Sequence, residues 1–304
     1  MHFKNITRDI CSLKIQGAEN IAKHSLIALR ELAHTSNSTT PKAFLNELEE
    51  GVKILIKTRP TEPCMRNALN FSLYDLRGRE MMDLAAIKRK LTIKISYALE
   101  HLRASSDKIA EIGARKIHDG MIIYTHCHSS TVVGILKKAK ENGINFEVHN
   151  TETRPKLQGR ITAAELAKHG IKVKHYVDSA ARIALKNADF MLIGADAITT
   201  EGNVINKIGS ELISEAADKM EIPVYCCSDS WKFDPLTVFG YEEEIEKRAD
   251  SEIWQNPPKN VKISNPAFEK INPELISGLI TELGIFKPSV FVEELKHRHP
   301  WMFE

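Results

Sequence analysis

The second half of the chain alternates short apolar runs with amphipathic segments, and this alternation restricts the fold more than any other feature. The apolar runs are Met121–Thr125, Phe146–His149, Val173–Val177, Phe190–Gly194 and Pro223–Cys227. The helix-like segments between them cover residues 129–143, 162–169, 179–187 and 206–220. Strand–helix units repeated in this way form an open parallel sheet with helices on both faces, because parallel strands need right-handed crossover connections. The pattern therefore predicts a Rossmann-like domain over residues 119–304, with a further edge strand at 276–282 and a last helix at 289–297.

The first half has helical periodicity and little that resembles a strand. Apolar residues recur at intervals of three and four within residues 20–33, after Pro41, and within 82–117. Thr40 before Pro41 is a typical helix start, and Pro60 ends that helix. The sequence thus predicts a helical N-terminal domain over residues 1–118. The expected fold class is α/β: this helical domain plus a Rossmann-like C-terminal domain with an open parallel sheet.

Charge and cysteine content exclude several classes of partner. The formal net charge is +2, and no basic cluster stands out, so we expect no nucleic-acid partner. No apolar stretch approaches the length of a membrane span, and no signal peptide precedes the first helix. The chain has 5 cysteines, an odd number without a CxxC pair, which indicates reduced thiols. We therefore expect a cytoplasmic protein with no membrane partner.

Polar side chains follow every predicted strand at the point where it ends. Because ligands of parallel sheets bind outside the carboxyl ends of the strands, these residues are the candidates for a site. They are Thr125–Ser130, Thr151–Pro155, Asp178 and Ser179, Gly194–Asp196, and Ser228–Lys232. A thiol, carboxylates, hydroxyls and cations are thus expected to converge on one edge of the sheet.

Cys127 and Asp196 are the candidate catalytic residues of this edge. Cys127 stands where a helix is about to begin, and a helix N-terminus stabilises a thiolate. The alternative is a small buried residue, which is the interpretation we give to Cys226 and Cys227 inside their apolar strand. Asp196 follows an apolar strand, so partial burial would let it hold a proton. Its alternative is a capping or turn aspartate, but opposite a thiolate it becomes a plausible acid.

An anionic, phosphorylated substrate is indicated by the hydroxyls and lysines of the same edge. Ser129, Ser130 and Thr131 open a predicted helix, and N-capping alone would account for only one of them. Lys207 opens another predicted helix and Lys232 follows the fifth strand, although single lysines are usually solvated. No GxGxxG or GxxxxGK[ST] motif is present, so dinucleotide and P-loop binding are not supported. Neither metal nor cofactor is predicted.

Six short motifs occur together in a characteristic order. They are Thr125-His126-Cys127-His128-Ser129, Thr151-Glu152-Thr153-Arg154-Pro155, Gln158-Gly159, Gly194-Ala195-Asp196, Asn206-Lys207-Ile208-Gly209 and Asn265-Pro266-Ala267-Phe268. In these motifs the chain resembles the aldose-1-phosphate isomerase and initiation-factor-2B superfamily, and within it the archaeal ribose-1,5-bisphosphate isomerases. The resemblance covers nearly the whole chain and is densest from residue 120 to 268. It implies a helical domain joined to a Rossmann-like domain.

The resemblance favours the enzyme branch of the superfamily, because both Cys127 and Asp196 are present. It implies conversion of ribose 1,5-bisphosphate to ribulose 1,5-bisphosphate, with the Cys127 thiolate as base, protonated Asp196 as acid and no metal. One alternative is a non-catalytic regulatory subunit like those of initiation factor 2B. The other is an isomerase of another sugar 1-phosphate such as methylthioribose 1-phosphate, although His128 stands where that branch has Asn.

The resemblance also nominates substrate-binding residues and assembly. The nominated positions are Gln16, Gly17, Ala18, Glu19, Arg59, Ser129, Ser130, Thr131, Gln158, Asn206, Lys207 and Lys232. Gln16 departs from the family pattern, which usually has Arg there, and glutamine lacks the permanent cation that pairs bidentately with phosphate. The implied partners are a small sugar phosphate and further copies of the chain, as a dimer or hexamer. Nucleotide activation is implied for some members.

Overall fold

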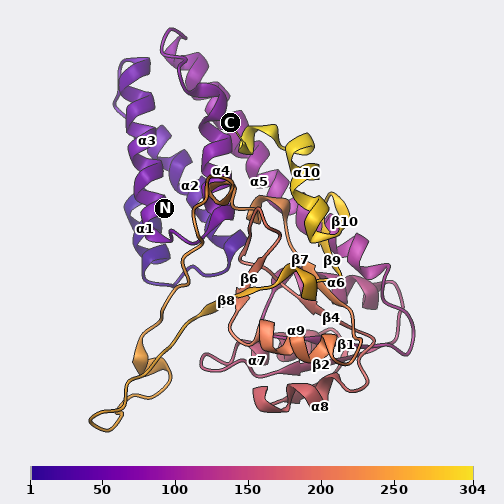
Figure 1. Ribbon diagram of the computed structural model, residues 1–304. Helices are drawn as coiled ribbons and strands as arrows, with labels where there is room; N and C mark the ends of the chain where they lie inside the picture. Colours follow the sequence, from indigo (N-terminus) through magenta and orange to yellow (C-terminus); the bar gives the residue numbers. More distant parts are fainter. Residues whose placement is uncertain (1, 304) are drawn as a thin grey trace. The chain divides into compact units, whose positions relative to one another are not determined.

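The computed structural model describes residues 2–303, and the chain divides into two compact units (Figure 1). The first unit comprises the chain up to Ala104, together with Trp231–Pro235 and the segment from Lys296 on. The second comprises Ser105–Ser230 and Leu236–Leu295. The division into a helical N-terminal domain of residues 1–118 and a Rossmann-like catalytic domain of residues 119–304 stays a prediction. Among residues 2–303 no helix combines the length and apolar character needed to cross a membrane.

The first unit is a helical bundle. Its helices are α1 Phe3–Cys11, α2 Ala18–Thr35, α3 Pro41–Thr58, α4 Pro63–Leu73 and the first part of α5 Leu84–Ala114. The core is made of fully buried aliphatic side chains such as Leu26, Leu48 and Leu69. Helices α2 and α3 approach closely at Gly51, where an added Cβ would lie 2.3 Å from the Leu32 Cδ2 atom. Helix packing of this kind explains why a glycine stands inside a helix in spite of its low propensity.

The helix starts of this unit follow from local chemistry. Thr40 accepts a hydrogen bond of 3.3 Å from the Ala43 backbone N–H, and Pro41 occupies the first turn, as the sequence predicted. The sequence predicted a break at Pro60 but no helix beyond it. Pro63 instead opens α4, because proline fits the first turn of a helix as well as it ends one. Helix α1 is short, and its two buried side chains, Ile6 and Ile10, gave too little periodicity to predict it.

The second unit contains a seven-stranded sheet in the order β10-β9-β7-β4-β1-β2-β3. Its strands are β1 Ile122–Thr125, β2 Glu147–Thr151, β3 Lys172–Tyr176, β4 Phe190–Ile193, β7 Val224–Cys227, β9 Gly278–Thr281 and β10 Gly284–Phe286. All neighbours are parallel except β9 and β10. The predicted α/β fold with an open, mostly parallel sheet is confirmed. The strand predicted at 276–282 is β9, which lies inside the sheet, because β10 forms a tight antiparallel turn after it and takes the edge.

Helices cover both faces of this sheet. Helices α6 Ser130–Glu141 and α7 Gln158–Lys168 pack against each other, and α6 buries Ile135 and Leu136 in the core cluster that also receives Leu166 from α7. Helices α8 Ala181–Leu185 and α9 Ser210–Asp218 pack together and contribute nothing to that cluster, which places them on the opposite face. Strand β3 forms the other edge of the sheet and is largely exposed, with Lys172 and Lys174 on it.

The chain reverses direction across the sheet at one point. From β1 it proceeds outward through β2 to β3, then returns to β4 on the other side of β1 and continues through β7 to β9. Strands β1 and β4 are direct neighbours, with Thr125 opposite Leu192. In doubly wound sheets the crevice outside the carboxyl ends of two such strands is where ligands bind. The topological switch point of this unit therefore lies between the ends of β1 and β4.

A second, three-stranded antiparallel sheet was not predicted from the sequence. It has the order β5-β6-β8, with β5 Ala197–Ile198, β6 Val204–Lys207 and β8 Phe268–Ile271. The prediction of a helix from residue 206 is wrong at its start, since Asn206 and Lys207 end strand β6 and α9 begins at Ser210. Val204 and Ile205 belong to strand β6. This strand pairs with β5, which comes just before it in the chain, and with β8, which comes more than sixty residues after it.

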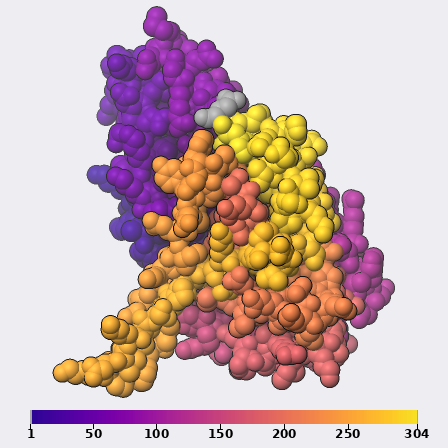
Figure 2. All heavy atoms as spheres, in the orientation of Figure 1, coloured from indigo at the N-terminus to yellow at the C-terminus, as the bar shows by residue number. Residues whose placement is uncertain are grey.

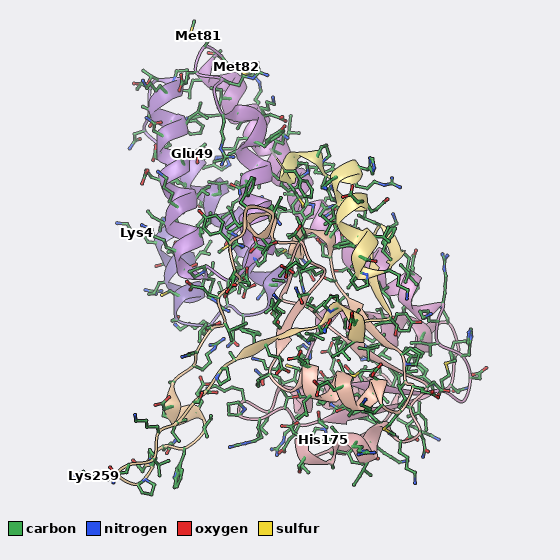
Figure 3. All side chains as sticks on the ribbon, in the orientation of Figure 1. Lys4, Glu49, Met81, Met82, His175 and Lys259 are labelled. Atoms are coloured by element: carbon green, nitrogen blue, oxygen red, sulfur yellow. The ribbon has the colours of Figure 1, made fainter. Side chains whose placement is uncertain are left out.

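An arm extends from the second unit between residue 239 and strand β8. Figure 2 shows it as a narrow projection, and Lys259 lies at its tip in Figure 3. It has little regular structure beyond the short 3-10 helix Asp250–Glu252. Apolar side chains such as Phe239, Tyr241 and Trp254 are exposed at its base and along it.

Candidate active site

Cys127 stands at the carboxyl end of β1 in an unusual backbone conformation. Its φ angle is 68°, in the left-handed region that side chains other than glycine rarely adopt. Its backbone N–H donates to Thr153 Oγ1 at 3.0 Å, and its carbonyl accepts from Thr162 Oγ1 at 2.9 Å. Its side chain is buried, with 8% exposure. Two threonines from different elements thus fix the residue that the sequence nominated as the base.

Asp196 follows β4, the neighbour of β1 at the switch point. Its backbone N–H donates to the Ile205 carbonyl at 2.8 Å, so the start of the small sheet fixes it, and the residue is half-buried. Gly194 lies against the start of α6, where an added Cβ would approach Ser129 Oγ to 2.7 Å. The charge of Asp196 acts on the Cys127 thiol. The two predicted catalytic residues therefore follow adjacent strands and are close enough to interact.

The thiol of Cys127 is neutral in this environment. Burial raises its pKa to about 11, the Lys207 ammonium and the His128 backbone N–H oppose that rise, and the Asp196 and Asp178 carboxylates add to it. The sequence predicted a helix N-terminus that stabilises the thiolate. Because Cys127 lies three residues before α6 begins and is almost fully buried, the loss of hydration is the larger effect.

Lys207 and Asn206 reach the site from the end of β6. The Lys207 ammonium lies 4.3 Å from the centroid of the Phe268 ring, a cation–π contact that holds its stem. Asn206 is buried, and its Nδ2 donates to Ser210 Oγ at 3.0 Å. Lys207 is thus the cation whose charge acts on Cys127 among the described residues.

His126 is buried beside Cys127 as a neutral imidazole. Its Nε2 lies 3.0 Å from the Ile208 carbonyl, which can only accept, so Nε2 carries the proton. Its Nδ1 then accepts from Thr151 Oγ1 at 2.8 Å, and Tyr124 OH donates to the same hydroxyl at 3.2 Å. Burial lowers the pKa of His126 and raises that of Tyr124. His126 thus links Thr151 at the end of β2 to the Ile208 carbonyl after β6.

The hydroxyl cluster forms the N-terminus of α6. Ser129 is its N-cap and accepts from the Val132 N–H at 3.4 Å, Ser130 is exposed and Thr131 is buried. The remaining amides of the first turn are suited to an anion. Gln158 opens α7, and its Oε1 is buried with no hydrogen-bond partner within the described part of the chain. A buried acceptor of this kind is ready to receive a donor from a ligand.

The remaining nominated residues belong to the first unit. Gln16 is exposed and donates to the Leu13 carbonyl at 2.6 Å, and Gly17, with φ 86°, caps α2 before buried Ala18. Glu19 pairs with Lys23. Arg59 is buried and pairs with Glu62 at 2.9 Å, and Lys232 is buried as well. For these six residues a role in binding stays a prediction from the resemblance.

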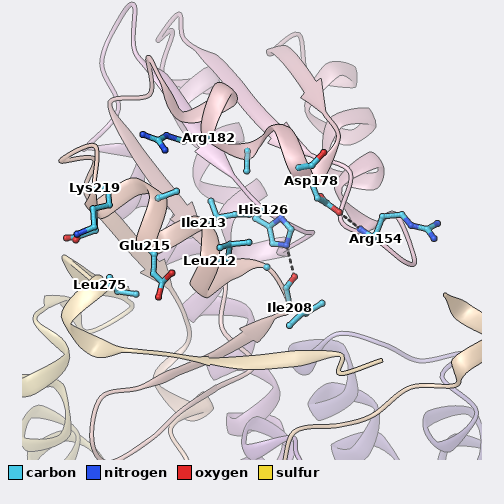
Figure 4. Close-up of a pocket in the computed structure, with 15 residues that line it drawn as sticks. His126, Arg154, Asp178, Arg182, Ile208, Leu212, Ile213, Glu215, Lys219 and Leu275 are labelled. Atoms are coloured by element: carbon cyan, nitrogen blue, oxygen red, sulfur yellow. Dashed lines mark hydrogen bonds between the residues drawn. The ribbon is translucent and has the colours of Figure 1, made fainter. Parts of the chain in front are cut away.

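A pocket of about 930 Å³ opens beside His126 (Figure 4). Helix α9 supplies most of its apolar wall, through residues that include Leu212 and Ile213, and Arg154, Asp178 and Arg182 lie around it. Its size is typical of small-molecule sites. Cys127 and Asp196 are not among the residues that line it. Among residues 2–303, no group of His, Cys, Asp or Glu side chains with metal-binding spacing includes Cys127 or Asp196.

Four residues that the sequence did not single out as catalytic or substrate-binding support the site. They are Thr151, Thr153, Thr162 and Asp178, which hold His126 and the Cys127 backbone directly or through one another. Three of them directly follow predicted strands, so their position at the sheet edge was visible. Thr162 lies inside α7, where the sequence carries no signal that its hydroxyl reaches Cys127. Cys226 and Cys227 are buried in β7, as predicted.

A doubly wound sheet with a thiol and a carboxylate at its switch point defines an α/β protein with a small-molecule site. The chain belongs to the Initiation factor 2 subunit family (IF-2B), whose pattern matches residues 14–288. This confirms the resemblance found in the sequence.

The chain is similar to enzymes and to a translation factor of this family. It is 38% identical to the ribose 1,5-bisphosphate isomerase of Thermococcus kodakarensis, over 97% of this chain and 94% of that protein. It is 32% identical to the methylthioribose-1-phosphate isomerase of Pelotomaculum thermopropionicum, over 94% and 83%. Its fold matches the translation initiation factor eIF-2B of Pyrococcus horikoshii with a TM-score of 0.81 and 29% identity, over 94% and 97%. The prediction of an enzyme is confirmed: the chain is an isomerase.

Proposed function

We propose that the chain is an aldose–ketose isomerase that converts ribose 1,5-bisphosphate to ribulose 1,5-bisphosphate. The observation that carries the proposal is the position of Cys127 and Asp196 after the two adjacent strands of the switch point. The reaction needs two groups that exchange protons with neighbouring atoms of one small substrate, and this pair supplies them. Relatives at 38–39% identity over most of the chain carry this activity in their names.

The chemistry explains why an acid and a base are both required. A phosphate on C1 prevents spontaneous opening of the sugar ring to a free aldehyde. In the proposed first step, the Cys127 thiolate removes the proton from C2, the C1=C2 double bond forms, and the bond from C1 to the ring oxygen breaks. Asp196, protonated, gives its proton to that oxygen. Asp196 then takes the proton of the C2 hydroxyl while the Cys127 thiol protonates C1, which yields the ketose and restores both groups.

The raised pKa of Cys127 constrains this scheme. With a pKa of about 11, roughly one thiol in ten thousand is ionised at pH 7 before substrate binds. Lys207 is the group that favours the ionised form, so we propose that it supports the base as well as an anionic ligand. Gln158 Oε1, the acceptor without a partner among the described residues, would receive a sugar hydroxyl. Ser129, Ser130, Thr131 and Asn206 would complete the polar surroundings.

Turnover of three substrates tests the proposal. Ribose 1,5-bisphosphate, ribose 1-phosphate and methylthioribose 1-phosphate are each incubated with the purified protein, and ketose formation is followed. We expect the bisphosphate to react fastest. Faster turnover of methylthioribose 1-phosphate would instead identify the chain as a methylthioribose-1-phosphate isomerase. Absence of turnover with all three would favour a regulatory role like that of the initiation factor.

Two variants separate the chemical roles. Cys127→Ser should abolish turnover while far-UV circular dichroism stays unchanged, because a hydroxyl is far less acidic than a thiol. Asp196→Asn should abolish turnover but keep substrate affinity, because the amide retains shape and polarity without an acidic proton. If affinity collapsed instead, Asp196 would be a binding residue.

We also propose that the protein forms homo-oligomers, as the resemblance implies. The exposed aromatic side chains of the arm support this, since such residues are enriched at interfaces between subunits. Sedimentation equilibrium tests it: a dimer or hexamer is expected, and a monomer at micromolar concentration would contradict the proposal.

A further inference from the structure

Two residues of the site share a strained backbone conformation. Cys127 has a φ angle of 68° and Thr153 one of 62°, both in the left-handed region. A β-branched residue such as threonine is especially disfavoured there. Conformations of this kind persist only where surrounding contacts impose them. The contacts around Thr153 therefore decide whether this part of the site keeps its shape.

The Asp178 carboxylate holds Thr153 from the next strand connection. Its Oδ1 accepts from the Thr153 N–H at 2.8 Å, and its Oδ2 accepts from the Arg154 N–H at 2.7 Å, a bond that Figure 4 shows. The parallel pairing of β2 with β3 brings Asp178 next to Thr153. Just after β2, the Glu152 N–H donates a further hydrogen bond of 2.9 Å to the Tyr176 carbonyl at the end of β3. Both oxygens of one carboxylate are thus used to fix two consecutive amides.

Thr153 in turn holds the candidate base. Its hydroxyl oxygen accepts from the Cys127 N–H at 3.0 Å, and this bond orients a residue whose own φ angle is strained. The opposite side of the Cys127 peptide is held by Thr162. The contacts therefore form a continuous path from Asp178 through Thr153 to the backbone of Cys127.

We propose that Asp178 is a positioning residue, which fixes the thiol of Cys127 in its reactive position by holding Thr153 in the left-handed conformation. The inference rests on the proposed function, in which Cys127 is the base. Asp178 touches no reacting atom in this scheme. Its contribution is to orientation, and a misplacement of a catalytic group by about 1 Å can cost on the order of a hundredfold in rate.

Steady-state kinetics of Asp178→Ala, Asp178→Asn and Thr153→Val test this role. Asp178→Ala should lower kcat by roughly ten- to a hundredfold and leave KM within about threefold. Asp178→Asn removes the charge but keeps one of the two acceptor oxygens, so its loss of kcat should be no larger than that of Asp178→Ala. Thr153→Val should lower kcat as far as Asp178→Ala. The double variant should then lose little more than either single variant, because both act through the same contact.

A matched control removes a similar carboxylate elsewhere in the sheet. Asp189 Oδ2 accepts from the Ile122 N–H at 2.8 Å at the opposite end of β1. Asp189→Ala should therefore keep the wild-type kcat. Equal losses in Asp189→Ala and Asp178→Ala would show a general effect on the fold. That result overturns the proposal, as does a wild-type kcat in Asp178→Ala.

Alkylation of Cys127 by iodoacetamide gives a readout that needs no substrate. The modified peptide is quantified by mass spectrometry after reaction at pH 9. Thr153→Val should react several-fold faster than the wild type, because the thiol is released from its held position without a change in charge. Asp178→Ala should react faster as well, because it also removes a carboxylate that raises the pKa of the thiol. Unchanged rates in both would overturn the proposal even if the wild type isomerises no sugar tested. Conversely, absent turnover with the expected alkylation change would reject the proposed function alone. If Asp178→Ala fails to fold, Thr153→Val carries the same test.

Discussion

At position 127 the proposed base combines a buried side chain with a disfavoured backbone angle. The sequence located this residue by its place after a strand. A stabilised thiolate was expected there, but the surroundings raise the pKa of the thiol. Helix α6 begins only after Ser129, so its N-terminus is not next to the thiol. Burial therefore disfavours the thiolate of Cys127 more than the helix terminus favours it. Reactivity at Cys127 must therefore depend on pH and on neighbouring charge.

The rate of Cys127 alkylation should rise steeply with pH. A thiol with a pKa of about 11 is protonated below that value, so the ionised fraction increases about tenfold for each pH unit. Between pH 7 and pH 9 the rate at the Cys127 peptide should rise about a hundredfold. Exposed Cys11 serves as the internal reference for labelling of an accessible thiol. A plateau at Cys127 below pH 9 would contradict burial as the dominant influence.

The Lys207 ammonium should lower the pKa of the Cys127 thiol. Removal of the Lys207 charge should therefore make alkylation of Cys127 slower than in the wild type. Lys207→Gln keeps a polar side chain of similar length but removes the charge that favours the thiolate. At pH 8 we expect a several-fold slower reaction at Cys127. Lys219→Gln, at the end of α9, is the matched control and should leave the rate unchanged. Equal rates in the wild type and Lys207→Gln would remove this ammonium from the electrostatics of the site.

Among the elements, the connection from β2 to α7 is the most tightly constrained. An added Cβ at Gly159 would lie 1.7 Å from the Thr151 carbonyl oxygen, which is backbone and cannot move aside. Gly159→Ala should therefore destabilise the fold by about 2 kcal/mol or more. Gly134→Ala in α6 is the control, because its Cβ would meet Ala110 at an ordinary 3.8 Å and helix propensity should stabilise it by up to about 1 kcal/mol. Urea denaturation measures both, and equal midpoints would contradict the close approach.

The elements also show what the sequence could and could not predict. Five of the six parallel strands were predicted as short apolar runs that alternate with amphipathic helices, and the sixth, β9, was predicted as an edge strand. The small sheet was not predicted, since β6 pairs with β8 more than sixty residues later and such pairing leaves no local pattern. The same reason applies within the site. Cys127 and Asp196 follow strands and could be nominated as candidates, whereas the hydroxyl of Thr162 reaches Cys127 only through the fold.

At the scale of the whole molecule, binding of two phosphates is the property that would separate this chain from relatives that act on one. We expect ribose 1,5-bisphosphate to bind at least tenfold more tightly than ribose 1-phosphate, since a charged hydrogen bond contributes about 1.5–3 kcal/mol. Lys232→Ala should weaken bisphosphate binding, and Lys259→Ala at the tip of the arm should not. Isothermal titration calorimetry on the two sugars measures this. Equal affinities would reject the bisphosphate as substrate and leave the isomerase class intact.

The exposed edge strand β3 has a consequence for behaviour at high concentration. An edge strand offers unpaired backbone groups on which another chain can add a strand, and this is a common start of aggregation. Lys172 and Lys174 on β3 make such addition costly, because an incoming chain would have to strip water from both ammonium groups, and Lys174 is also paired with Glu147 at 3.0 Å. Replacing both lysines by threonine would keep strand propensity and remove that protection. Light scattering of the concentrated double variant should then increase over hours, while the wild type stays clear.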